Sequence, residues 1–98
     1  MTPEELQRIV DNELRELRNE IDTIDDQIVN LLNKRAEIVI DVGKSKSKIG
    51  IGPLDEDREN KIIERLGAQC EGLLSDKNVK NIYQAILQEM RKIETNHQ

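Results

Sequence analysis

Apolar side chains recur at alternating spacings of three and four residues through the N-terminal half of the chain. Arg35 interrupts this stripe, whose apolar members include Leu14, Leu17, Ile21, Ile24, Ile28, Leu31, Ile38 and Val42. The alternation is the heptad pattern of a helix that packs lengthwise against another helix. Pro3 suits a first helical turn, and no further Pro or Gly occurs before Gly43. We therefore predict a helix over about residues 4–47, about 65 Å long at 1.5 Å per residue.

Two further helices are predicted after a clear break in the pattern. The break is Gly50-Ile51-Gly52-Pro53, where the proline disfavours helical backbone at the residue before it. Asp55 is a suitable N-cap and predicts a helix over about residues 55–71, and Ser75 similarly predicts one over about residues 76–95. No stretch shows the alternation typical of a strand, so we expect an all-α fold with three helices per chain.

Composition narrows the classes of function. With 98 residues, the chain is expected to form one helical domain, residues 1–98. A net charge of −5 and a single aromatic residue, Tyr83, argue against a nucleic-acid partner. No apolar run approaches about 20 residues, so no membrane span is expected. A single cysteine, Cys70, and an N-terminus without a basic-then-apolar segment favour a cytoplasmic protein.

The long stripe also predicts an assembly and a binding site. It needs a covering surface longer than the rest of the chain can supply, so a second copy is the economical partner. Arg35 lies in the stripe, where an unpaired charge costs several kcal/mol, and Lys46 lies eleven residues further, about 20° from the same face. Arg35 either fixes the register of paired helices or has a functional role, and Lys46 either lies at a frayed helix end or has a functional role.

Two other sets of side chains each share a helix face. In the second predicted helix these are Asp55, Arg58, Glu59 and Ile62. In the third they are Tyr83, Leu87, Met90 and Glu94. Taken alone, each set is also explained by capping and solvated charges. The sequence shows no metal-ligand cluster, Ser/His/Asp set or glycine-rich phosphate loop, which argues against hydrolysis, redox chemistry and phosphoryl transfer.

Taken together, these motifs resemble the all-helical, AroQ-type chorismate mutase family. The segment LRNEIDTIDDQIVNLLNKRAEIVIDVGKSK, residues 17–46, is similar to the family's first helix, and LDEDRE, residues 54–59, to its second motif. The similarity spans about residues 14–95. It implies an isomerase that converts chorismate to prephenate in Phe and Tyr biosynthesis, without nucleophile, metal or cofactor. It also implies an intertwined antiparallel homodimer, a six-helix bundle with two sites.

The resemblance further implies roles for four charged residues. Arg35, together with Arg18 of the other subunit, corresponds to the arginines that bind the two substrate carboxylates. Lys46 corresponds to a lysine that contacts a carboxylate and the ether oxygen of the substrate. Glu94 stands where a Gln or Glu donates a hydrogen bond to that ether oxygen. Because a carboxylate cannot donate, Glu94 would have to be protonated in this role.

The remaining positions complete the implied site. Asp55 and Glu59 match positions around the ring hydroxyl, and Arg58 matches an arginine at the edge of the site. Apolar walls are implied at Val42, Ile62 and Leu87. Met90 departs from the family pattern, in which a small or hydroxyl residue is frequent at this position. A thioether cannot donate a hydrogen bond, so we expect weaker substrate binding than in relatives.

The spacing of the arginines supports a site built from two chains. Arg18 and Arg35 are separated by about 25 Å along one helix, so they cannot bind one small dicarboxylate from the same helix. Two other functions stay open at this point. An isochorismate–pyruvate lyase has the same fold, but tends to carry an apolar residue at the position of Glu59. A non-catalytic dimeric helical module leaves Arg35 and Lys46 unexplained. The chain can stand alone or be fused to a prephenate dehydratase, a prephenate dehydrogenase or an aldolase-type synthase.

Overall fold

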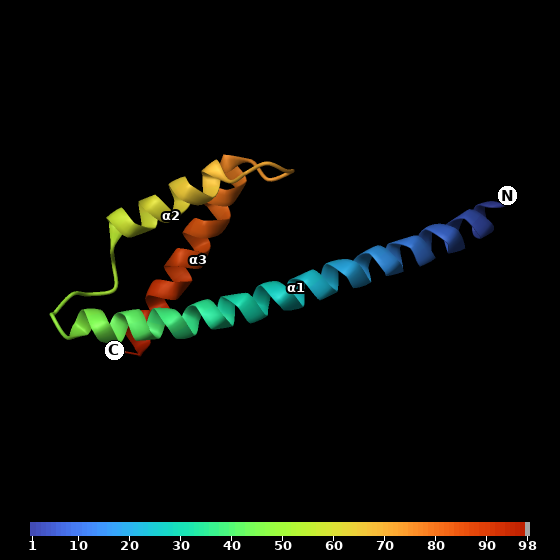
Figure 1. The fold of residues 1–98 in the computed structure, drawn as a ribbon. Helices are drawn as coiled ribbons and strands as arrows, with labels where there is room; N and C mark the ends of the chain where they lie inside the picture. The colour runs from blue at the N-terminus through green and yellow to red at the C-terminus, as the bar shows by residue number, and fades with distance from the viewer. Residues whose placement is uncertain (98) are drawn as a thin grey trace. The chain divides into compact units, whose positions relative to one another are not determined.

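The computed structural model describes residues 1–97 and consists of three α-helices (Figure 1). These are α1, Pro3–Ser47, α2, Glu56–Ala68, and α3, Asp76–Asn96. Residues 1–97 contain no strand, which confirms the predicted all-α fold with three helices per chain. The bounds of α1 and α3 lie within one residue of those predicted, whereas α2 ends three residues earlier than expected.

Local side-chain chemistry explains where α2 and α3 begin. The Asp55 side chain accepts a hydrogen bond from the backbone N–H of Arg58 at 3.0 Å, as expected for an N-cap. Ser75 caps α3 in the same way, because its hydroxyl accepts from the backbone N–H of Asn78 at 3.1 Å. The Asn78 side chain in turn accepts from the backbone N–H of Ser75 at 2.9 Å, which completes a capping box.

The early end of α2 also has a local cause. The backbone N–H of Gln69 bonds to the carbonyl of Leu66, and that of Cys70 bonds to the carbonyl of Gly67. These three-residue hydrogen bonds tighten the last turn and stop the α-helical pattern. Cys70, which was predicted to lie inside this helix, therefore follows its end.

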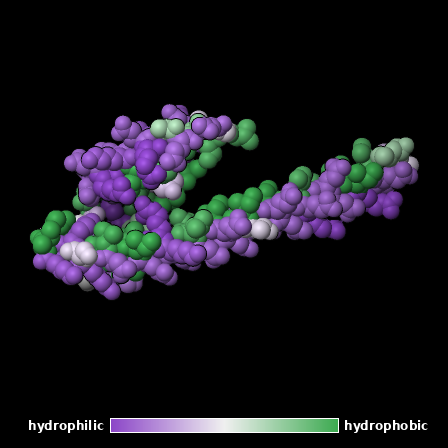
Figure 2. All heavy atoms as spheres, viewed as in Figure 1, coloured by the Kyte–Doolittle hydropathy of each residue, from purple (hydrophilic) through white to green (hydrophobic). Residues whose placement is uncertain are grey.

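The chain divides into two compact units, of which the first is Met1–Lys34. This unit consists mostly of the N-terminal part of α1, and none of residues 1–34 is buried. Apolar side chains gather along one face of α1, as Figure 2 shows. From Leu14 to Leu31 the stripe side chains are between 37% and 63% exposed. The single chain therefore leaves the apolar face of this unit in contact with solvent.

The second unit comprises the described residues from Arg35 onward. Within it, α3 runs from the turn after α2 back to the last turns of α1 (Figure 1). Four apolar side chains of α2 and α3 form its small buried core: Ile62, Val79, Leu87 and Met90. The carboxylate-bearing side chain of Glu94 is buried as well. None of the three helices in residues 1–97 is long and apolar enough to cross a membrane.

Candidate functional site

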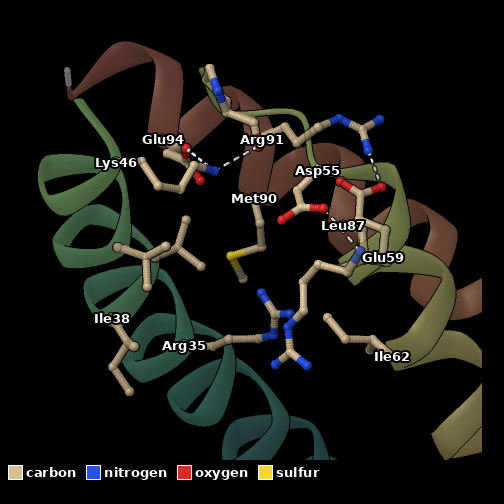
Figure 3. A pocket seen from close by; sticks show the side chains of 14 residues that line it. Arg35, Ile38, Lys46, Asp55, Glu59, Ile62, Leu87, Met90, Arg91 and Glu94 are labelled. Atoms are coloured by element: carbon tan, nitrogen blue, oxygen red, sulfur yellow. Dashed lines mark hydrogen bonds and ion pairs between the residues drawn. The ribbon is translucent and has the colours of Figure 1, made fainter. Parts of the chain in front are cut away.

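A cavity of about 300 Å³ opens in the second unit (Figure 3). Its lining comes from the last turns of α1, the loop before α2, the first half of α2 and the last turns of α3. Half of the lining is apolar: Ile38, Val39, Val42, Pro53, Ile62, Leu87 and Met90. The other half is charged: Arg35, Lys46, Asp55, Arg58, Glu59, Arg91 and Glu94. A concave site with apolar walls and a few converging polar groups is typical of small-molecule binding.

The charges of the lining favour an anionic ligand. Four cationic side chains face three acidic ones, which leaves one net positive charge. Some of these charges are already paired with each other, and the pairs differ in how much of their side chains is exposed to solvent. Two pairs decide the geometry of the site, Lys46 with Glu94 and Glu59 with Arg91.

Lys46 and Glu94 meet where the end of α1 faces the end of α3. Lys46 Nζ lies 3.0 Å from Glu94 Oε2, and it donates a hydrogen bond of 3.1 Å to the carbonyl oxygen of Pro53. The Glu94 side chain is 7% exposed and that of Lys46 is 18% exposed. This pair is therefore shielded from solvent and fixes the lysine ammonium at the rim of the cavity (Figure 3).

The Oε2 atom of Glu94 is close to an ammonium but is not hydrogen-bonded. Its contact with Lys46 is ionic, and among the described residues it has no hydrogen-bond partner. Buried polar atoms are hydrogen-bonded in the great majority of cases. Glu94 thus holds a buried oxygen with unused hydrogen-bonding capacity in the lining of the cavity.

Glu59 and Arg91 form an ion pair that joins α2 to α3. Figure 3 shows the Glu59 carboxylate turned toward Arg91, while the Asp55 carboxylate lies nearer the cavity. Sequence reasoning did not single out Arg91. The signal was present, because Arg91 follows Leu87 by four residues and precedes Glu94 by three, which places it on their helix face.

Ten of the eleven site residues implied by the sequence line this one cavity. They are Arg35, Val42, Lys46, Asp55, Arg58, Glu59, Ile62, Leu87, Met90 and Glu94. The eleventh, Arg18, belongs to the first unit and is exposed. Met90 is buried and extends from α3 into the cavity toward Arg35 (Figure 3). No group of three His, Cys, Asp or Glu side chains within residues 1–97 could hold a metal ion.

The chain is similar in sequence to chorismate mutases. The family model described as chorismate mutase type II matches residues 17–95. The chain is 30% identical over 82 residues to the chorismate mutase of Methanocaldococcus jannaschii, a match that covers 83% of this chain and 83% of that protein. It is 44% identical over 54 residues to the bifunctional chorismate mutase/prephenate dehydratase of Aquifex aeolicus, covering 55% of this chain but only 15% of that protein.

A solved structure agrees with these sequence matches. The crystal structure of chorismate mutase from Helicobacter pylori in complex with prephenate superposes with a TM-score of 0.83 at 28% identity. The match covers 88% of this chain and 93% of that chain. The similarity therefore extends over nearly the whole fold.

Proposed function

Because the chain belongs to the chorismate mutase type II family, we propose that it catalyses the rearrangement of chorismate to prephenate. The observation that carries the proposal is the grouping of Arg35, Lys46 and Glu94 around a cavity with apolar walls. The relative from Helicobacter pylori was crystallised with prephenate, the product of this reaction. We place the reaction in the synthesis of Phe and Tyr, in keeping with the fusion to prephenate dehydratase in Aquifex aeolicus.

The reaction matches the chemistry that these side chains offer. In chorismate one ether C–O bond breaks while a C–C bond forms within the same molecule, so no protein nucleophile is needed. An acceleration of about 10⁶, at the low end for enzymes, corresponds to about 8 kcal/mol. The protein can supply this by holding the compact reactive conformer and by stabilising the charge that develops on the ether oxygen.

Arg35 is suited to the first of these tasks. Its guanidinium extends from α1 toward the cavity (Figure 3) and can hold a carboxylate through two parallel hydrogen bonds. Val42, Ile62 and Leu87 supply apolar walls against which the substrate ring can pack. A dicarboxylate held at one end and confined by these walls is thus restricted toward its folded form.

Lys46 and Glu94 are suited to the second task. The Lys46 ammonium is held in place by the Pro53 carbonyl and by Glu94, so it needs little reorganisation as negative charge builds on the ether oxygen. Glu94 can assist only as a donor, and must therefore take up a proton before it contacts that oxygen. We propose that the proton lies on the other oxygen, Oε1, because Oε2 faces the Lys46 ammonium at 3.0 Å and must accept from it.

We also propose that the working form is an antiparallel homodimer, a six-helix bundle in which Arg18 completes the site of the other chain. The exposed stripe from Leu14 to Leu31 supports a helical partner of the same length. The chemistry of the substrate supports the added arginine. Chorismate carries two carboxylates, and Arg18 of a second copy would bind the one that Arg35 does not hold.

The experiment that tests the function is incubation of the purified chain with chorismate. We expect loss of chorismate absorbance and formation of an equal amount of prephenate. The protein background is low, because the chain has one Tyr and no Trp. An Arg35→Ala variant serves as the control for contaminating mutase. Release of pyruvate from isochorismate, with chorismate left intact, would instead indicate the related lyase, and inertness toward both substrates a non-catalytic helical module.

A further inference from the structure

Gly43 is a buried glycine one turn before the end of α1, an unfavourable combination of residue type and helical position. It is buried, whereas the rest of α1 is exposed or half-buried. Glycine inside a helix is less stable than alanine by about 1 kcal/mol. Its backbone does not require glycine, because among the described residues only Gly50 has a positive φ. The reason for Gly43 therefore lies in the space around it.

That space is occupied by Glu94. A Cβ atom at position 43 would lie 2.7 Å from Glu94 Cγ, 3.3 Å from Cδ and 3.5 Å from Oε2. Carbon atoms in van der Waals contact are separated by about 3.5–4.0 Å, so the first of these distances is a clash. Glu94 cannot easily yield, since its Cγ lies in the middle of the side chain and its carboxylate is paired with Lys46.

We propose that Gly43 is a positioning residue of the site. Its missing side chain provides the space in which Glu94 lies, and so sets where the Glu94 carboxylate meets the Lys46 ammonium. Gly43 and Lys46 are three residues apart on α1, which puts both on the face toward Glu94. The consequence for catalysis rests on the proposed mutase function, whereas the steric relation between Gly43 and Glu94 does not.

A melting experiment on four proteins tests the steric relation. The proteins are the native chain, Gly43→Ala, Glu94→Ala and the double variant. We expect Gly43→Ala to lower Tm in the native chain, because the added methyl group displaces Glu94. In the Glu94→Ala background the same change should raise Tm, because Cγ is gone and alanine is the better helix former. Equal shifts in both backgrounds, or a higher Tm of Gly43→Ala alone, would overturn the proposal.

Gly67 provides the matched control. It is also a glycine inside a helix, α2, and a Cβ there would lie 3.8 Å from Asp76 Cγ, an ordinary contact. Gly67→Ala should therefore leave Tm unchanged or raise it in both backgrounds. If Gly43→Ala does not fold at all, the double variant decides the matter. A folded double variant supports the proposal, and an unfolded one contradicts it.

Kinetics test the positioning role itself. Loss of one oriented donor typically lowers kcat about 10²–10³-fold, so a displaced one should lower it about tenfold. We expect this fall in kcat for Gly43→Ala with little change in KM, and no further fall when Glu94 is already Ala. An unchanged kcat in Gly43→Ala would refute the role. A native chain without mutase activity would refute the proposed function instead, and the melting results would still stand.

Discussion

Lys46 is held by two oxygens of different kinds, a backbone carbonyl and a buried carboxylate. This arrangement predicts that Lys46→Ala slows the chemical step, because the variant lacks an ammonium that is already oriented before negative charge develops on the substrate. We expect kcat to fall about 10²–10³-fold, with a smaller change in KM. Steady-state kinetics with chorismate measure both quantities. A variant whose KM rises while kcat stays native would assign Lys46 to binding alone.

Glu94 predicts a specific pH dependence. If the acid form donates to the ether oxygen, activity is present while Glu94 holds its proton and is lost as rising pH removes it. Glu94→Gln places an amide donor at the same position and should keep activity at higher pH. The measurement is kcat as a function of pH for both proteins. If kcat depends on pH in the same way in both proteins, Glu94 does not donate a hydrogen bond to the substrate.

The pairing of α2 with α3 is the feature of interest at the scale of elements. The Glu59–Arg91 ion pair connects the two helices at the edge of the cavity and is partly exposed. Such pairs contribute about 0–1 kcal/mol, so the stability effect of breaking this one should be small. Breaking the pair should affect activity more than stability, because Glu59 loses the partner that orients its carboxylate.

Arg91→Gln is therefore expected to lower kcat/KM about two- to fivefold with little change in Tm. Lys92→Gln is the matched control, because Lys92 is the next residue and pairs with Glu89 of the same helix in an exposed position. That variant should have native kinetics. Equal kinetic effects of the two substitutions would mean that Arg91 acts only as a surface charge. Partial rescue by Arg91→Lys would support the orienting role.

At the scale of the whole molecule, the decisive question is how the exposed stripe of α1 is covered. A homodimer in which Arg18 crosses to the other chain predicts complementation between two inactive variants, Arg18→Ala and Arg35→Ala. Mixing them by unfolding and refolding should restore about a quarter of the native activity. Random pairing makes half of the dimers mixed, and each mixed dimer has one intact site of two.

The outcome that contradicts this model is equally specific. If Arg18→Ala alone is fully active, then Arg18 is not part of the site. If both variants are inactive and mixing restores nothing, the two arginines do not come from different chains. Native mass spectrometry of the mixture before the assay, with one variant labelled by heavy isotopes, confirms that mixed dimers have formed.

The sequence by itself determined the helices and most of the site. The heptad stripe predicted α1, because side-chain periodicity is a local property of a helix. Asp55 and Ser75 predicted the starts of α2 and α3, since a cap bonds to backbone only three residues away. The resemblance to a family supplied residues that share one cavity, from Arg35 to Glu94.

The tertiary structure alone decided which of these residues touch. Lys46 and Glu94, Gly43 and Glu94, and Glu59 and Arg91 each meet across more than 30 positions of sequence. Periodicity places a residue on one side of its own helix, but it does not show which residues of other helices contact that side. That depends on how α3 returns to the end of α1, and on how closely a residue without a side chain lets the two approach.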